Sequence, residues 1–329
     1  MEDESVGFVN RFVGAKSPEA LREAQGMVQN IFDSQYDSSE LWQSEREKTP
    51  EQIEIIRFVD KITNEFLASC GLSAKSVPVE NIHLIDPADF KNRNNNNVGV
   101  YSPELQAITF SADVAEINIV FVRNLIHEML HAKAFSSVDI VSDDGSDVSD
   151  RRVGFAVMPR SDRKDIPGDV AEDGFLFHRL NEAITELVTE LIMRENAEEF
   201  ESSPLFADDI KQTRGLRLEA LGILDDVYYI GKTEEDELFG FGFGYERERE
   251  LLVELVQKLY SRNQTTFSDP VEVFDLFKAG AIGGNILPVA RLIEKTFGPG
   301  SFKELGIVTA SRHDDPEQAD PFVEFIEKL

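Results

Sequence analysis

The feature that most constrains this fold is an apolar, helix-length segment that carries two histidines four residues apart. Residues 127–131 read His-Glu-Met-Leu-His, within a helix that the sequence predicts over residues 114–135. On a helix, positions i and i+4 lie on one face, so His127 and His131 can reach a single point. The residues on either side of the motif are apolar, which predicts that this helix is buried.

Two imidazoles at this spacing are typical of a zinc site. Neutral imidazole nitrogen is a preferred ligand of zinc, and three protein ligands with one open position make a catalytic site. Glu128, next to the first histidine, can accept a proton from a water that the ion activates. The chain has only five histidines, so a chance match is expected only roughly 0.01 times. The motif therefore predicts a zinc cofactor, with His127 and His131 as ligands and Glu128 as the catalytic base.

A third ligand must come from elsewhere in the chain, and a helix predicted over residues 178–196 offers two carboxylates. Residues 181–186 read Asn-Glu-Ala-Ile-Thr-Glu. We predict Glu182 as the third metal ligand. Glu186, one turn later on the same face, is predicted to orient a ligand histidine from outside the coordination sphere. His178 lies one turn before Glu182 and is the rival ligand.

The two motifs together resemble the gluzincin branch of zinc metallopeptidases, the thermolysin-like group. In that branch the third ligand is a glutamate on a later helix, often inside an Asn-Glu pair. The resemblance covers residues 98–196 and implies a zincin-like core that hydrolyses peptide bonds, with Glu128 as the general base. The gap between His131 and Glu182 exceeds that in several gluzincin families, so the family stays unassigned.

The resemblance also implies a strand that pairs with the substrate backbone and a side chain that stabilises the oxyanion. Residues 107–110 are the expected strand, with residues 152–158 as the alternative. Tyr245, at the start of a predicted helix, is the candidate oxyanion donor and therefore a candidate catalytic residue, with Tyr228 and Tyr229 as alternatives.

The chain as a whole predicts an α+β fold that is mostly helical. We expect an N-terminal helical segment over residues 1–75, a zincin-like core with a small mixed β-sheet over residues 76–200, and a C-terminal helical region over residues 201–329 that packs on the core. The expected helices are 18–33, 51–70, 114–135, 178–196, 216–229, 245–260, 270–279, 287–297 and 316–329. The expected strands are 81–85, 98–101, 107–110 and 152–158.

Other segments are predicted to be irregular or structural. The Asn-rich residues 92–97, the Ser- and Asp-rich residues 136–150 and the Phe- and Gly-rich residues 239–245 are interpreted as loops. The acidic loop lacks the spacing of an EF-hand, so no calcium site is predicted there. Cys70, the only cysteine, is interpreted as a small buried side chain near the end of a helix. Three arginines are interpreted as solvated cations or partners of the acidic loop rather than as substrate ligands: Arg151, Arg152 and Arg160.

Composition excludes two classes of partner. The 62 acidic residues against 33 basic ones give a net charge of −29, which repels nucleic acid and favours basic peptides over acidic ones as substrates. No run of about 18 apolar residues predicts a membrane span, and the acidic residues 1–5 do not resemble a secretory signal. We therefore expect a cytoplasmic protein that acts on a peptide or protein, with no prediction of its oligomeric state.

Two other functions fit the same residues. One is a catalytically inactive zincin-like module that binds a partner protein through its helical ends. The other is a metal-dependent hydrolase of a non-peptide amide, which would use the same ligands.

Overall fold

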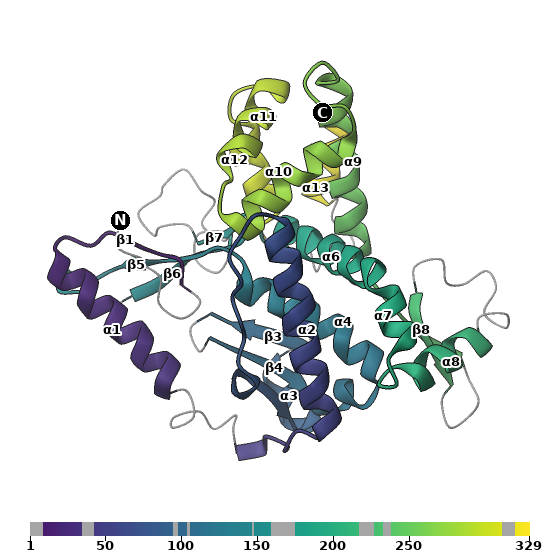
Figure 1. The fold of residues 1–329 in the computed structure, drawn as a ribbon. Helices are drawn as coiled ribbons and strands as arrows, with labels where there is room; N and C mark the ends of the chain where they lie inside the picture. Colours follow the sequence, from purple (N-terminus) through teal and green to yellow (C-terminus); the bar gives the residue numbers. More distant parts are fainter. Residues whose placement is uncertain are drawn as a thin grey trace. The chain divides into compact units, whose positions relative to one another are not determined.

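The structure is a computed structural model of the chain, and it describes residues 9–34, 43–94, 98–103, 106–146, 148–158, 175–216, 227–232, 238–310 and 320–329. The described residues are mostly helical with small mixed sheets, which confirms the α+β expectation (Figure 1). The chain divides into two compact units. The first unit comprises Met1–Asn30, Ala134–Leu187 and Tyr245–Leu329, and the second comprises Ile31–Lys133 and Val188–Gly244.

The second unit contains a three-stranded sheet next to the helix that carries the two histidines. Its strands are β2 (Ile82–Ile85), β3 (Gly99–Ser102) and β4 (Ala107–Ser111). The order is β2–β4–β3, with β4 parallel to β2 and antiparallel to β3. Because β2 and β3 use the backbone hydrogen-bonding groups on the two sides of β4, this central strand cannot pair with a substrate backbone. The expectation that residues 107–110 pair with a substrate is therefore wrong.

The outer edge of β2 is covered by residues 44–46 of the same chain. The Arg46 N–H donates to the Leu84 carbonyl at 2.7 Å, and the Asp86 N–H donates to the Ser44 carbonyl at 3.0 Å. Within the described part of the chain, no strand pairs with the outer edge of β3. Of the two outer strands, β3 is thus the one that has backbone groups available for a further strand.

Glu45, in this covering segment, makes the stability of the second unit depend on pH. Its carboxylate lies 3.0 Å from His83 Nδ1 and 3.1 Å from Lys48 Nζ. Burial raises the pKa of Glu45, but the contacts with His83 and Lys48 outweigh burial, so the pKa lies below its ordinary value of 4.5. A lowered folded-state pKa stabilises the fold above the unfolded pKa, and this stabilisation is lost as the pH falls through the folded pKa.

We therefore expect the free energy of unfolding to fall more steeply between about pH 5 and about pH 3 in wild type than in Glu45→Gln. Urea denaturation at each pH measures both slopes. Parallel slopes in the two proteins would contradict this role for Glu45.

Helices α2 (Pro50–Ser69) and α4 (Asn118–Lys133) pack together beside this sheet (Figure 1). The helix expected over 51–70 is confirmed, and Thr49 and Gln52 form a reciprocal capping box at its start. Four apolar residues of α2 at steps of three and four are buried: Ile55, Val59, Ile62 and Phe66. Cys70 is exposed at the C-cap of α2, so its interpretation as a buried side chain is wrong. Cys70 lies beyond Leu67, the last buried residue of α2.

The rest of the second unit corrects three expectations about loops and helices. Helix α3 (Pro87–Asn94) includes residues 92–94, which were expected to be a loop. Helix α7 spans Ala197–Ser202, α8 spans Ala207–Leu216, and strands β8 (Val227–Lys232) and β9 (Leu238–Gly242) form a separate antiparallel pair. The helix expected over 216–229 is wrong at 227–229, while 217–226 lie outside the described residues. The loop expected over 239–245 is wrong at 239–242, where aromatic residues alternating with Gly follow the two-residue period of a strand.

The first unit contains a four-stranded sheet of order β1–β5–β6–β7. Its strands are β1 (Arg11–Val13), β5 (Ser136–Ile140), β6 (Val148–Val153) and β7 (Ala156–Val157). The loop expected over 136–150 is therefore wrong at both ends, and the N-terminal segment is not wholly helical. Val138 and Ile140, two residues apart, join a buried cluster with residues of β1 and of helix α1 (Pro18–Ser34). This packing outweighs the polar composition of the segment.

The helices of the first unit largely agree with those expected from the sequence. Their bounds are His178–Glu195 (α6), Glu246–Arg262 (α9), Pro270–Gly283 (α10), Leu287–Phe297 (α11), Ser301–Val308 (α12) and Pro321–Lys328 (α13). Helix α6 begins in the first unit and ends in the second. The helices expected over 178–196, 245–260, 270–279 and 287–297 are confirmed, and α12 was not expected. Helix α13 confirms the end of the helix expected over 316–329, of which 316–319 lie outside the described residues.

Arg152 of β6 holds the C-terminal end of α10. Its guanidinium donates to the carbonyls of Gly154 at 2.5 Å, Gly280 at 2.6 Å and Gly284 at 2.9 Å, and it lies over the Phe135 ring at 4.9 Å. Burial lowers the pKa of Arg152 to about 10. The interpretation of Arg152 as a solvated cation is wrong, because its side chain satisfies backbone carbonyls that α10 leaves unpaired at its end.

We expect Arg152→Met to lower the free energy of unfolding by roughly 3 kcal/mol, because it leaves buried carbonyls without donors. Urea denaturation measures this loss. Arg247→Met is the control, since the Arg247 side chain is 57% exposed, and it should change stability by less than about 0.5 kcal/mol. Equal stability of the two variants would exclude the capping role of Arg152.

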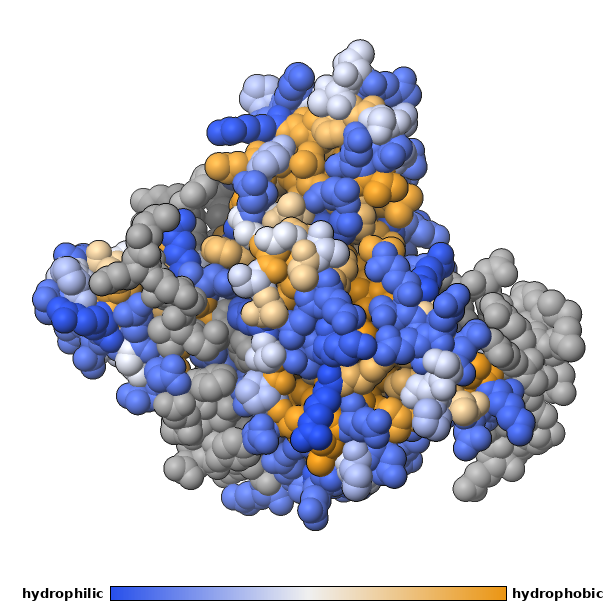
Figure 2. All heavy atoms as spheres, in the orientation of Figure 1, coloured by the Kyte–Doolittle hydropathy of each residue, from blue (hydrophilic) through white to orange (hydrophobic). Residues whose placement is uncertain are grey.

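Figure 2 shows hydrophilic residues over much of the described face, with apolar residues gathered in smaller areas between them. No described helix combines the length and the apolar character needed to cross a bilayer.

Candidate metal site

Helix α4 brings the two histidines together, as the motif predicts. All but three of its residues are buried, and Glu128 and His131 are two of the half-buried ones. The Nε2 atoms of His127 and His131 lie 3.1 Å apart, and the two rings meet edge to face with centroids 4.8 Å apart. The i and i+4 spacing therefore places two ligand nitrogens at one point.

Glu182 lies in the second turn of α6, and the first turn of that helix is firmly held within the first unit. Arg179 donates through Nη1 and Nη2 to the two carboxylate oxygens of Asp320, at 2.7 and 2.6 Å, and through Nε to Glu248 at 3.1 Å. The Arg179 N–H also donates to the Thr309 carbonyl at 2.8 Å. A bidentate arginine–carboxylate pair fixes geometry as well as adding energy, so the direction of this turn is defined.

Asn181, the residue before Glu182, anchors the same turn to the sheet of the first unit. Its Oδ1 accepts a hydrogen bond from the Phe155 N–H at 2.7 Å. Gly154 makes this approach possible, since its φ is +59° and a Cβ there would lie 2.3 Å from Asn181 Oδ1. The Asn-Glu pair of the sequence thus combines one anchoring side chain with one candidate ligand.

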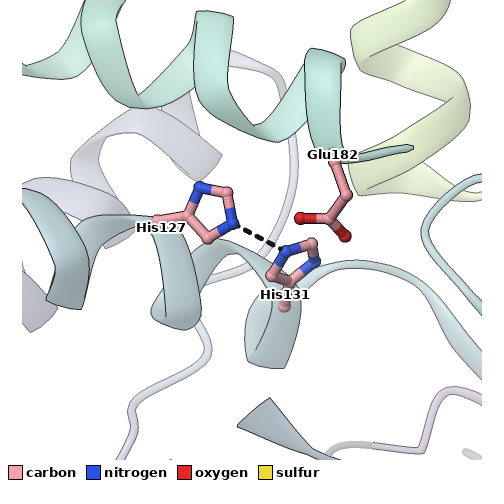
Figure 3. Close-up of side chains that lie close together, drawn as sticks. All are labelled: His127, His131 and Glu182. Carbon is pink, nitrogen blue, oxygen red and sulfur yellow. Dashed lines mark hydrogen bonds between the residues drawn. The ribbon is translucent and has the colours of Figure 1, made fainter. Parts of the chain in front are cut away.

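His127, His131 and Glu182 form a group that could hold a metal ion. One ligand atom from each lies within 4.8 Å of the others, and Figure 3 shows the two imidazoles of α4 and the carboxylate of α6 directed toward one another. His127 and Glu182 are 4% and 6% exposed. Nitrogen ligands of tetrahedral zinc lie about 3.3 Å apart, close to the 3.1 Å between the imidazole nitrogens. Two imidazoles and one carboxylate are a donor set that fits zinc.

The rival ligand and the predicted outer residue lie on the same helix. His178 is not in the group of three, and its Nδ1 lies 3.9 Å from Glu182 Oε1 with the side chain 40% exposed. Glu186 is fully buried one turn after Glu182. Its role in orienting a ligand histidine stays a prediction.

Glu128 is held by the edge strand of the sheet in the second unit. Its Oε2 accepts a hydrogen bond from the Tyr101 N–H of β3 at 2.8 Å. This backbone N–H is therefore directed away from β4 and toward α4. Gly99 lets β3 lie close to the Phe110 ring of β4 and to Glu128 of α4. A Cβ at position 99 would lie 2.4 Å from the Phe110 ring and 3.3 Å from Glu128 Cγ. Neither Gly99 nor the Tyr101 N–H was predicted from the sequence, although a glycine within a strand is a known sign of close approach.

We expect Gly99→Ala to lower the free energy of unfolding by about 1–3 kcal/mol, because the Phe110 ring has no room to move within a packed core. The matched control is Gly26→Ala in α1, where a Cβ meets nothing within 4 Å. That helix-interior change should stabilise the chain by about 0.5–1 kcal/mol. Urea denaturation compares the two, and a neutral or stabilising Gly99→Ala would contradict the close approach.

The tyrosine candidates have different environments. Tyr245 is the N-cap of α9 with φ +53°, a left-handed conformation that is uncommon outside glycine. Tyr228 and Tyr229 lie on strand β8, and Tyr229 is 4% exposed. Burial, and then the charge of Asp209, raise the pKa of Tyr229. The part of Tyr245 in stabilising an oxyanion stays a prediction.

No protein-family profile, no curated protein and no solved structure matches this chain. The chemistry of the candidate site therefore follows from its own geometry.

Proposed function

We propose that this protein is a zinc-dependent peptidase with a zincin-like core, in which His127, His131 and Glu182 hold the ion. The observation that carries the proposal is the group of three ligand atoms within 4.8 Å, with Glu128 next to the first ligand in the chain. A buried donor set of two imidazoles and one carboxylate leaves a fourth position for substrate or water, as catalytic zinc sites do.

When bound, zinc would polarise the scissile carbonyl and lower the pKa of a water in its open position. Glu128 accepts the proton of the attacking water and delivers it to the leaving amine. The Tyr101 N–H restrains the Glu128 carboxylate at 2.8 Å, so the base is oriented before substrate arrives. Tyr245 is the proposed donor to the oxyanion.

Strand β3 is the proposed binding edge for the substrate backbone, in place of β4. Residues 44–46 cover the opposite edge of the sheet, and the Tyr101 N–H of β3 already faces Glu128. A peptide added to β3 would run past the catalytic base and would be bound through its main chain, with little sequence demand. The net charge of −29 favours basic peptides, most strongly at low salt.

The decisive experiment measures zinc content and turnover on the same preparation. We expect one zinc per chain and cleavage of a quenched-fluorescence peptide library that a chelator abolishes and added zinc restores. Stoichiometric zinc without cleavage of any peptide would contradict the peptidase proposal. In that case, hydrolysis of non-peptide amides and capture of a protein partner are the next measurements.

A further inference from the structure

Lys133 ends helix α4 two residues after His131, and its side chain is fully buried against α2. Its ammonium lies 2.8 Å from Asp60 Oδ1 and donates to the Asp60 carbonyl at 3.0 Å, to Thr63 Oγ1 at 2.7 Å and to Asn64 Oδ1 at 3.1 Å. Two residues along a helix differ in direction by about 200°. Lys133 therefore points to the side of α4 away from His131, and one helical turn carries both an anchor and a ligand.

The acceptors of Lys133 are themselves held in place. Asp60 Oδ1 also accepts the Val77 N–H at 2.9 Å, and Asp60 Oδ2 accepts from Asn64 Nδ2 at 3.2 Å. Asn64 Oδ1 also accepts the Lys75 N–H at 2.9 Å. Because these bonds fix the acceptors on α2 and on the segment that follows it, the ammonium is satisfied in only one axial and rotational position of α4.

An apolar side chain would fill the same space without the cost of removing a charge from water. Buried ion pairs contribute little to stability compared with well-packed apolar residues, but they can select one arrangement among several. The two helices, which pack together, have ample buried apolar side chains, since Ile55 and Val59 of α2 and Met129 of α4 are all fully buried. What apolar packing does not supply is a unique register between the two helices.

We propose that Lys133 is a positioning residue of the metal site, which locks the last turn of α4 onto α2 and so sets where the His131 imidazole lies. The inference rests on the proposed function in one respect, namely that His131 binds the ion. It does not depend on peptide cleavage.

The test replaces the ion pair by groups of similar shape that keep the acceptor of the Val77 N–H. Asn64 Nδ2 loses Asp60 Oδ2 as an acceptor but keeps Ser76 Oγ at 3.4 Å. In the double variant Asp60→Asn/Lys133→Met, the amide oxygen introduced at position 60 can still accept the Val77 N–H, and the methionine side chain fills the space of the lysine. We expect the metal-free double variant to be at least as stable as wild type in urea. We expect its zinc affinity, measured by competition with a chelator, to fall by about 10- to 100-fold, as for loss of an outer partner of a ligand. The visible spectrum of the cobalt-substituted protein should also change.

Val59→Ala is the matched control, since it removes buried volume from the same face of α2 without touching the ammonium. It should lower stability and leave zinc affinity and the cobalt spectrum unchanged. A double variant with wild-type zinc affinity and cobalt spectrum would overturn the proposal. Zinc affinity that falls in step with stability in both variants would also overturn it, in favour of a merely structural role.

The outcomes for the two proposals are distinct. A wild type that binds no zinc removes the proposed function and this inference together. A wild type that binds zinc but cuts no peptide contradicts the peptidase alone, and the affinities of the variants still decide the role of Lys133.

Discussion

Replacing Glu128 by Gln is expected to lower peptide turnover by about 10²- to 10⁴-fold, the usual contribution of a positioned base. Glutamine has the size of the native side chain, and its amide oxygen can still accept the hydrogen bond that the Tyr101 N–H now donates at 2.8 Å. What it loses is the ability to take a proton at neutral pH. The measurement is kcat/KM on a quenched peptide, beside a zinc titration of the same protein.

Zinc affinity should be unchanged in Glu128→Gln, because Glu128 is not among the three proposed ligands. Glu128→Asp keeps the carboxylate but shortens its reach, so its rate should lie between wild type and Glu128→Gln. Glu250→Gln, at a side chain that is 63% exposed on α9, should behave as wild type. Undiminished turnover in Glu128→Gln would remove Glu128 as the base, and a loss of zinc would make it a ligand.

The parts of the site that the sequence predicts are those set by local geometry. His127 and His131 meet because a helix places positions four apart on one face, and the apolar flanks of the motif predict that this helix is buried. Glu182 is different, since only the tertiary structure brings α6 to α4. It was predicted as one of two carboxylates on a second helix, and the close approach of its carboxylate to the imidazoles agrees with that prediction.

The parts that the sequence did not predict depend on long-range pairing or on the backbone. The central place of β4 follows from its pairing with β2, more than 20 residues earlier in the chain, and no local pattern encodes strand order. The donor to Glu128 is the backbone N–H of Tyr101, which every residue except proline carries. In the sequence, Lys133 is an ordinary charged residue at the end of a helix. Only its contacts with α2 show that its side chain is buried and ion-paired.

Glu182→Ala is expected to weaken zinc binding by more than the roughly 10- to 100-fold that loss of an outer partner costs. The substitution removes the only anionic ligand of the proposed set and leaves two neutral imidazoles to hold a divalent ion. Turnover at limiting zinc should fall with the affinity. Glu182→Asp keeps the charge on a shorter stem and should retain part of both.

His178→Ala is the control that decides between the two candidate ligands on α6. The His178 side chain is 40% exposed, and its Nδ1 lies 3.9 Å from Glu182 Oε1, so its removal should leave zinc affinity close to that of wild type. If His178→Ala loses zinc and Glu182→Ala keeps it, the third ligand is the histidine. Equal losses in the two variants would instead mean that both groups contact the ion, which closes the fourth position. A closed site with four protein ligands is the mark of structural zinc, so this result would favour a binding module over a peptidase.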